Sequence, residues 1–245
     1  MVRRLNSYKQ LCTEFYDLDK PEAPPLALAF YWQLYEAQGG PALEVMCGSG
    51  RFLLPFATRG AGIDGVDASP EMLAACRRAL EQRGLHAALY EQFAEDLDLP
   101  RRYRYAFVPG GSFVLIPHEA QANVLGRLAR HLEPGALLAV ELHPPAKGNY
   151  FTSTGKTERR VTRPDGAEIV LTVQDGGAYQ YDLVRDGAVL SSEVETYGWN
   201  PRERLEFVSM LEAAGFTSVE ALRPYTTTPA TDEEGFVVYV CRRSA

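Results

Sequence analysis

Residues 44–50 read EVMCGSG and residues 62–73 read GIDGVDASPEML, and these two segments decide the fold. The apolar run before the glycines predicts a buried strand. Gly48 and Gly50 predict a tight strand-to-helix turn, because glycine accepts positive φ and lets a ligand approach the backbone. Asp67 ends the next apolar run, 17 residues after Gly50. In a strand–helix–strand unit this spacing brings a carboxylate beside the glycine turn, where it can bind both hydroxyls of a ribose.

Two classes of ligand suit such a turn. A dinucleotide fingerprint has a third glycine that allows close helix–strand packing, and Leu53 occupies that position here. Glu44 lies just before the turn, so a bound diphosphate would meet additional negative charge, whereas a cationic ligand would not. The pattern therefore favours a cationic cofactor, with an NAD-dependent oxidoreductase as an alternative.

The pattern Glu-x-x-x-Gly-x-Gly that begins at Glu44, followed by Asp67 before a capped helix, resembles the class I (Rossmann-like) S-adenosylmethionine-dependent methyltransferases of the small-molecule type. Residues 131–142, HLEPGALLAVEL, are similar to the helix–Pro-Gly–strand passage near the end of that family's core. The resemblance covers residues 42–143 and, more loosely, residues 201–245. It implies an α/β fold, with a doubly wound, mostly parallel seven-stranded sheet and helices on both faces. It also implies S-adenosylmethionine as the cofactor and methyl transfer to an oxygen, nitrogen or carbon of a small-molecule acceptor.

Composition narrows the function classes. The chain has 245 residues, of which 46% are hydrophobic, and this suffices for one domain with an insertion. A net charge of −7 argues against a nucleic-acid surface, and no apolar run approaches the ~18 residues of a membrane span. The four cysteines and four histidines are scattered, which predicts no metal site and, without a secretory signal, a reducing cytoplasmic location.

Strands and helices alternate from residue 42 to about residue 145, which predicts a parallel sheet. Residues 150–198 are rich in Thr, Val and Tyr with several turn signals, and they predict three or four antiparallel strands inserted into the single domain. We expect this insertion to form either an acceptor lid or a homodimer surface. Residues 1–38 predict an N-terminal helical cover, and Ser69 and Pro70 predict the capped start of a helix.

Local signals also predict element boundaries. A helix is expected from Arg51 to Thr58, and the third strand is expected at residues 87–90. Residues 133–135, Glu-Pro-Gly, are expected to form a turn before a strand at residues 137–142.

The resemblance implies a cofactor site at the carboxyl ends of the parallel strands. The cofactor-binding residues that it implies are Glu44, Cys47, Gly48, Gly50, Asp67, Ala68, Met72, Gln92, Phe93, Ala94 and Pro109. The segment after the third strand departs from the family's usual acidic pattern. We therefore expect Gln92 to accept a hydrogen bond from the adenine amino group, with Asp96 as the competing choice.

Methyl transfer is an in-line displacement at a carbon that the sulfonium already activates, so alignment and exclusion of water can supply most of the rate. A base is needed only if the acceptor must lose a proton. His143 and His118 follow strands at the ligand-binding edge and are candidate bases, and Tyr16 is a candidate to close over the site. Residues 109–113, PGGSF, lack the Asn/Asp-Pro-Pro-aromatic pattern of enzymes that methylate nucleic-acid bases. A cofactor-binding protein without catalysis is the alternative of a different class.

Overall fold

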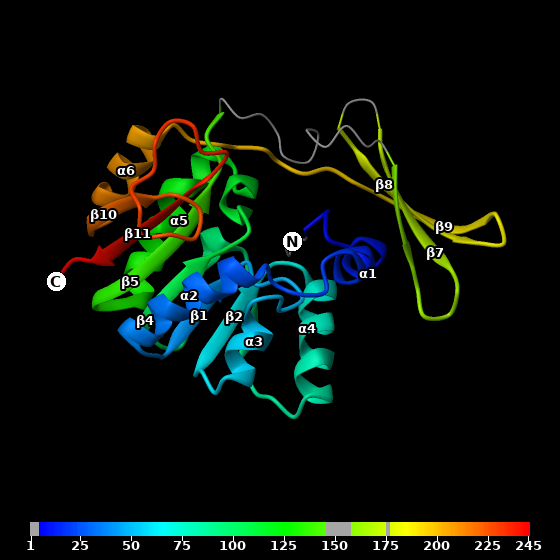
Figure 1. Ribbon diagram of the computed structural model, residues 1–245, viewed down its shortest axis with the longest axis horizontal. Helices are drawn as coiled ribbons and strands as arrows, with labels where there is room; N and C mark the ends of the chain where they lie inside the picture. The colour runs from blue at the N-terminus through cyan, green and yellow to red at the C-terminus, as the bar shows by residue number, and fades with distance from the viewer. Residues whose placement is uncertain (1–4, 146–157, 175–176) are drawn as a thin grey trace.

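The computed structural model describes residues 5–145, 158–174 and 177–245. Its larger sheet has seven strands in the order β10-β11-β5-β4-β1-β2-β3 (Figure 1). The strands are β1 (Ala42–Val45), β2 (Ile63–Asp67), β3 (Leu89–Glu91), β4 (Tyr103–Val108), β5 (Leu132–Leu142), β10 (Phe216–Leu222) and β11 (Val237–Arg243). β1 to β5 pair in parallel, and β11 is antiparallel to both β5 and β10. The predicted fold class is therefore confirmed.

The strand order reverses at β1, which pairs with β2 on one side and β4 on the other. In open α/β sheets, ligands bind at this reversal, beyond the carboxyl ends of the strands. The four residues of β1 are all buried, because both faces of a parallel sheet are covered by helices. The fold thus directs the turn after β1 and the end of β2 into the same crevice.

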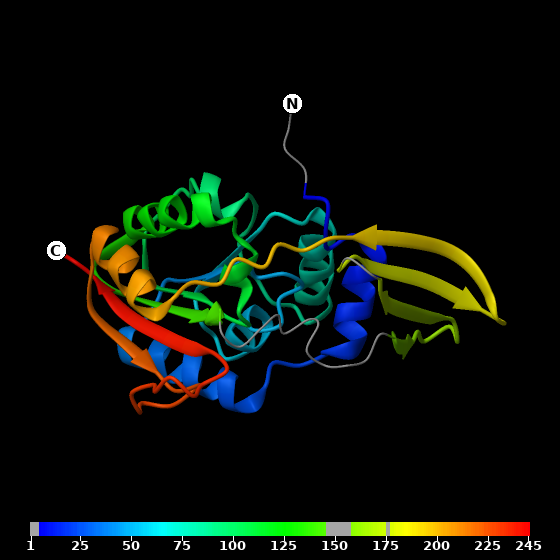
Figure 2. The ribbon, with the colours of Figure 1, turned by 90° about the horizontal axis from the view of Figure 1, so that it is seen from above.

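Helices cover both faces of this sheet (Figure 2). They are α2 (Pro25–Gln38), α3 (Leu53–Thr58), α4 (Pro70–Gln82), α5 (His118–His131) and α6 (Arg204–Ala213), with short 3-10 turns η1 (Ala94–Asp96) and η2 (Ser112–Leu115). α5 and α6 pack on one face through Leu125 and Phe207. α2 and α3 pack on the other through Tyr31 and Phe56. The side chain of Ser69 accepts a hydrogen bond from the backbone of Met72, which confirms the predicted cap of α4.

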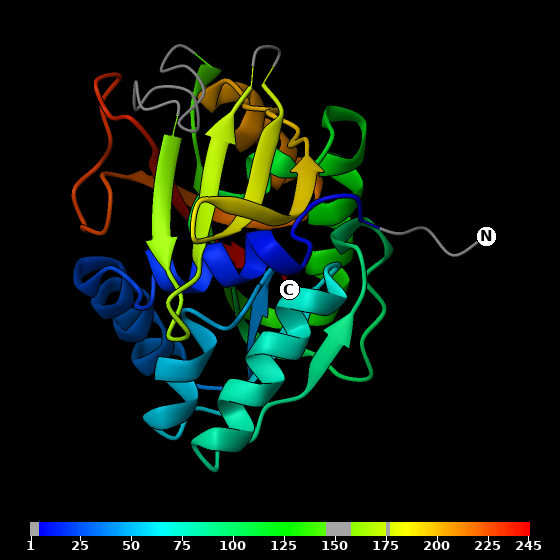
Figure 3. The same cartoon turned by 90° about the vertical axis from the view of Figure 1, so that its right-hand side faces the viewer.

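A second sheet, which we call the inserted sheet, has four antiparallel strands in the order β6-β7-β8-β9. They are β6 (Glu158–Thr162), β7 (Glu168–Val173), β8 (Tyr179–Arg185) and β9 (Ala188–Glu195). The inserted antiparallel strands are thus as predicted, while residues 150–157 and 175–176 of that range lie outside the described residues. The sheet stands beside the core with α1 (Gln10–Asp19) between them (Figures 1 and 3). Leu11 and Phe15 of α1 pack against Ile169 and Tyr181 of the sheet.

Some element boundaries differ from the sequence-based expectation. α3 begins at Leu53, because Arg51 and Phe52 still belong to the turn. Residues 133–135 lie within β5 and do not end it; the register between β4 and β5 shifts there, so the Pro-Gly pair bulges within a continuous strand. The third strand runs from Leu89 to Glu91 and is shorter than expected. Within the described ranges, no helix combines the length and apolar character that a membrane crossing requires.

Candidate functional site

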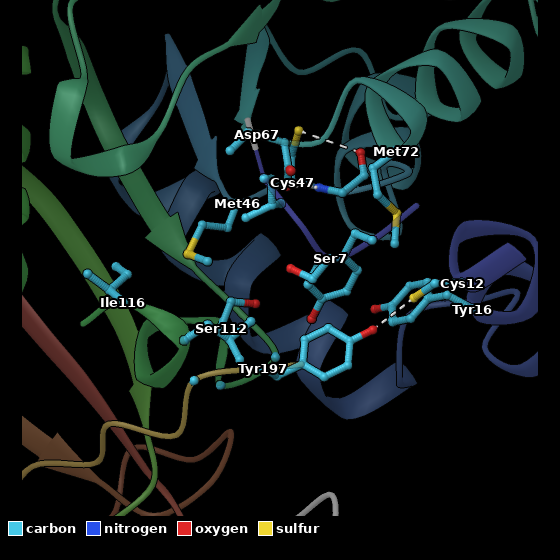
Figure 4. A pocket seen from close by; sticks show the side chains of 18 of the residues that line it. Ser7, Cys12, Tyr16, Met46, Cys47, Asp67, Met72, Ser112, Ile116 and Tyr197 are labelled. Carbon is cyan, nitrogen blue, oxygen red and sulfur yellow. Dashed lines mark hydrogen bonds between the residues drawn. The ribbon is translucent and has the colours of Figure 1, made fainter. Parts of the chain in front are cut away.

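A cavity of about 430 Å³ lies at the carboxyl ends of β1, β2 and β4. Its size falls in the range of small-molecule sites, about 300–1,000 Å³. We call the loops that follow these strands the core wall. The opposite side, which we call the outer wall, is formed by residues 5–8, α1, the inserted sheet and the segment after β9. Figure 4 shows Asp67 and Met46 on the core wall and Ser7 and Tyr197 on the outer wall.

The glycine turn after β1 contributes its backbone to the core wall. Gly48 has a φ of 54° and donates its N–H to Asp67 Oδ2 at 2.8 Å. A Cβ at Gly48 would meet Met72 Sδ at 3.7 Å and nothing closer, so the turn remains open to a ligand. Gly50 behaves differently: it does not line the cavity, and a Cβ there would lie 2.7 Å from Cys76 Sγ. Gly50 is therefore required for packing against α4, whereas Gly48 faces the ligand space.

Asp67, at the end of β2, lines the cavity and also braces its turn. Oδ2 accepts the N–H of Gly48, and Oδ1 accepts the N–H of Ser69 at 2.9 Å. Burial raises the pKa of this carboxyl, and the backbone hydrogen bonds oppose that rise. Each carboxylate oxygen can accept more than one hydrogen bond, so Asp67 can bind ligand hydroxyls while it holds the turn. The bracing role was not visible in the sequence.

Glu44 supplies a second carboxylate to the same wall. It is only 2% exposed, and its Oε2 atom has no hydrogen-bond partner among the described residues. Burial raises its pKa well above the ordinary value, the backbone N–H of Leu53 opposes this, and the charge of Asp67 adds to it. A buried oxygen without a partner is costly, so this end of the cavity favours a ligand with positive charge or hydrogen-bond donors.

The loop after β3 lines the cavity with Gln92, Phe93 and Ala94. The Gln92 amide, however, is already engaged: Oε1 accepts the backbone N–H of Asp98 at 2.9 Å, and Nε2 donates to the Asp98 carbonyl at 3.0 Å. The side chain thus closes its own loop, and the backbone of this segment remains the part that can face an adenine ring. Asp96, the competing choice, is exposed and does not line the cavity.

Cations gather near Tyr16 at another part of the cavity. Arg51 Nη1 lies 3.5 Å from the Tyr16 hydroxyl, and the Lys20 ammonium lies 5.3 Å from the centre of the Tyr16 ring. Burial lowers the pKa of Lys20, and the charge of Arg51 lowers it further. Both cations line the cavity, so this region suits an anionic group on a ligand.

The catalytic candidates separate clearly. His143 lines the cavity between the rings of Trp199 and Phe236, each 5.5 Å away between ring centres. Its Nδ1 atom lies 3.2 Å from the Gly235 carbonyl oxygen, and burial lowers its pKa. His118 is exposed, faces the Pro201 carbonyl oxygen at 2.9 Å and does not line the cavity.

Tyr16 also lines the cavity, from α1. Burial raises the pKa of its hydroxyl, while the nearby Arg51 lowers it. The remaining predicted cofactor residues that line the cavity are Cys47, Ala68, Met72 and Pro109.

The outer wall holds the residues that the sequence left unidentified. Tyr197 lies between Cys12 Sγ at 3.1 Å and the Tyr181 hydroxyl at 3.3 Å, and it donates to Glu195. Tyr179 lines the same side. Strand alternation indicated that one face of the insertion is packed, but it could not show which tyrosines meet the cavity, because that depends on how α1 docks.

Comparisons with known proteins agree with this geometry. Residues 42–135 match the family model described as a methyltransferase domain. A demethylmenaquinone methyltransferase of Thermus thermophilus is 35% identical over 118 residues, which are 44% of this chain and 50% of that protein. The chain thus matches about half the length of this curated relative.

Solved structures extend the likeness over the whole fold. The CcbJ methyltransferase from Streptomyces caelestis has a TM-score of 0.73 at 22% identity and covers 98% of this chain and 99% of its own. CalS10 from Micromonospora echinaspora, an amino pentose methyltransferase solved with S-adenosylmethionine bound, has a TM-score of 0.67 at 19% identity and covers 99% and 100%. Residues 42–135 are therefore a methyltransferase domain, and the chain has the class I methyltransferase fold, which confirms the predicted resemblance.

Proposed function

We propose that this chain, which carries that methyltransferase domain, moves a methyl group from S-adenosylmethionine to an oxygen, nitrogen or carbon of a small-molecule acceptor. The observation that carries the proposal is the Asp67 carboxylate, hydrogen-bonded to Gly48 at a cavity that also contains the unpartnered Glu44 oxygen. Together they offer a ribose-binding acid, an open glycine turn and a surplus of negative charge.

That surplus favours a sulfonium cofactor over a dinucleotide. Glu44 and Asp67 are both buried carboxyls with raised pKa values, and the charge of Asp67 contributes to the rise at Glu44. A diphosphate beside them would add repulsion, whereas a cation would relieve it. The NAD-dependent alternative therefore lacks support from the charge distribution.

The residues present fit S-adenosylmethionine, which supplies a methyl group on a positively charged sulfur when bound. Asp67 would hold the ribose hydroxyls, and the backbone at Phe93 and Ala94 would face the adenine. Arg51 and Lys20 suit the carboxylate of the amino acid head. The outer wall covers this space, so it excludes water and aligns the acceptor with the methyl group.

We assign the role of base, where the acceptor must lose a proton, to His143 rather than Tyr16. The lowered pKa of His143 keeps its ring neutral near pH 7, and the Gly235 carbonyl beside Nδ1 favours a proton on that nitrogen, which leaves Nε2 as the acceptor. Burial instead keeps the Tyr16 hydroxyl protonated, so Tyr16 serves as part of the cover.

A small-molecule acceptor is supported by the aromatic outer wall and by the names of the relatives, which describe methylation of demethylmenaquinone and of an amino pentose. The net charge of −7 argues against nucleic acid as the acceptor. Val189 and Leu190 of β9 are 59% and 57% exposed at the edge of the inserted sheet, and this edge supports a homodimer as a further proposal.

Asp67→Ala tests the cofactor site. We expect S-adenosylhomocysteine to bind the wild type, and the variant to lose about 2–4 kcal/mol of binding free energy, because a charged acceptor of hydrogen bonds is removed and the turn loses its brace. Isothermal titration calorimetry measures this, with NAD as a second ligand. Asp96→Ala is the matched control, since Asp96 is exposed outside the cavity, and its affinity should not change.

Tight NAD binding without binding of S-adenosylhomocysteine would overturn the proposal. Equal affinity in folded Asp67→Ala protein would reduce Asp67 to a structural residue. Cofactor binding without methyl transfer to any of a broad acceptor panel would favour a binding protein over an enzyme.

A further inference from the structure

A buried carboxylate that the proposed chemistry does not use lies beneath the turn after β4. Glu141, near the end of β5, is 2% exposed and pairs in the sheet with Val238 of β11. Its Oε1 atom accepts the hydroxyl of Tyr31 at 2.7 Å and that of Tyr225 at 3.1 Å. Within residues 5–145, 158–174 and 177–245, no ion pair to Glu141 is present. A charge buried without a cation is costly, so its hydrogen bonds require a reason.

The turn above it supplies two more donors. Gly110 and Gly111 have φ angles of 67° and 68°, a left-handed conformation that glycine adopts without strain. The backbone N–H groups of both residues hydrogen-bond to the Glu141 carboxylate. Two consecutive peptide units are thereby oriented by one side chain from the neighbouring strand.

The same turn is also restrained from the cavity side. A Cβ at Gly111 would lie 2.6 Å from His143 Nε2, so the His143 ring rests directly on this residue. The carbonyl of Pro109 is held by the backbone N–H of Ser112 at 3.3 Å and by its hydroxyl at 3.0 Å. Pro109, Gly110, Gly111 and His143 all line the cavity. The turn is therefore a fixed part of the core wall.

The orientation has a chemical consequence. In a trans peptide unit the N–H and the C=O point in opposite directions. Because the Gly111 N–H is directed at Glu141, the Gly110 carbonyl is directed away from it, and Gly110 lies at the cavity surface. No hydrogen bond to that carbonyl oxygen occurs within the described residues. An aligned carbonyl at this position can accept a hydrogen bond from an ammonium group.

We propose that Glu141 is a positioning residue that orients the Gly110 carbonyl toward the ammonium of the cofactor's amino acid head. The inference rests on the proposed function, since it assumes a cofactor of that class. Glu141 touches no ligand itself and acts through the two peptide units that it holds. The two tyrosines complete its shell, so the carboxylate keeps one orientation.

The experiment separates positioning from general stability by using two ligands. S-adenosylhomocysteine carries the amino acid head, and 5′-methylthioadenosine keeps the adenosine and the sulfur but lacks that head. In Glu141→Gln we expect the affinity for S-adenosylhomocysteine to fall at least tenfold, and the affinity for 5′-methylthioadenosine to change less than twofold. Calorimetry on the full chain measures both.

Tyr225→Phe removes one hydroxyl from the same carboxylate, so it should give a smaller loss with the same selectivity. It also tests the inference if Glu141→Gln fails to fold. Tyr239→Phe is the control, because Tyr239 is buried in the same sheet but packs on Phe207 away from the turn. Its affinities for both ligands should match the wild type.

An equal loss for both ligands in the folded variants, or no loss for either, would overturn the positioning role. A wild type that binds neither ligand would instead overturn the proposed function, and this inference with it. A wild type that binds both ligands with equal affinity would leave the cofactor proposal standing and would remove the contact to the amino acid head.

Discussion

The core wall and the outer wall of the cavity are built in different ways. The core wall consists of strand ends and turns between Glu44 and His143, and it presents backbone groups and two carboxylates. The outer wall combines α1 with an inserted sheet far away in the sequence, and it presents mainly aromatic side chains such as Tyr179 and Tyr197. The first suits a fixed cofactor, because backbone geometry changes little with sequence. The second suits a variable acceptor, because side chains can be exchanged without altering the fold.

Tyr8 joins the two walls. Its backbone carbonyl accepts the hydroxyl of Ser69 at 2.7 Å on the core side, and its backbone N–H donates to Glu195 at 2.7 Å on the outer side. Its ring packs edge-on against Tyr197 at 5.1 Å. Ser69 is also the cap of α4 and the neighbour of Asp67. The two walls therefore meet directly beside the proposed ribose-binding acid.

Removal of the inserted sheet should have the largest effect. Replacing residues 158–195 with a short glycine-serine linker strips α1 of its apolar partner, so methyl transfer should be abolished and S-adenosylhomocysteine affinity should fall at least tenfold. The core should still unfold cooperatively, because its own clusters are intact. Calorimetry and thermal denaturation measure both outcomes.

Unchanged cofactor affinity in this deletion would show that the core wall binds the cofactor without its cover. Light scattering on the wild type and the deletion distinguishes the other proposed role of the insertion. A dimeric wild type and a monomeric deletion would identify the sheet as a subunit interface.

Glu195→Ala should have the next largest effect. Glu195 is 1% exposed and accepts the backbone N–H groups of Tyr8 and Lys9, each at 2.7 Å, and the hydroxyl of Tyr197. Loss of this carboxylate leaves buried donors without partners, so we expect unfolding to become easier by about 2–4 kcal/mol. Denaturant unfolding measures the change, and limited proteolysis reports whether residues before α1 become accessible.

Glu193→Ala is the matched control on the same strand. Glu193 also accepts a backbone N–H of α1, from Leu11 at 2.8 Å, but it is less buried. Its loss should cost about 1 kcal/mol. Equal costs for the two variants would contradict the view that Glu195 is the principal link between the walls.

The pH dependence of His143 should give the smallest effect. Burial lowers its pKa below the ordinary value of about 6.5. As the pH falls below that value, the unfolded chain takes up the proton first, so the contribution of this residue to stability is present above pH 6.5 and is lost toward lower pH. His143→Phe keeps an aromatic ring and should flatten the dependence of the melting temperature between pH 7.5 and 5.5. The exposed His118→Asn serves as the control, and an identical pH profile for His143→Phe and wild type would contradict the prediction.

Local patterns were sufficient for most of the core. Ser69, Pro70 and Asp67 act through neighbours within a few residues, so their positions at the start of α4 followed from spacing alone. Gly48 and Gly50 looked equivalent in the sequence and are not. One faces the cavity, and the other faces Cys76, because α4 approaches the turn from one side only. The amide of Gln92 was assigned to adenine, but Asp98 lies six residues further along the same loop and engages both of its atoms.

The sequence by itself determined the class of fold, the glycine turn with its acid, and the insertion of an antiparallel sheet. These features depend on hydrophobic periodicity and on residues close together in the chain, where the geometry is nearly fixed. Only the tertiary structure decided which side chains meet across the cavity: Glu195 with Tyr8, Tyr197 with Cys12, and Glu141 with the turn after β4. Those contacts depend on how α1 docks between two sheets and on which strands become neighbours. No local pattern encodes that arrangement, because it is set by the burial of whole surfaces against one another.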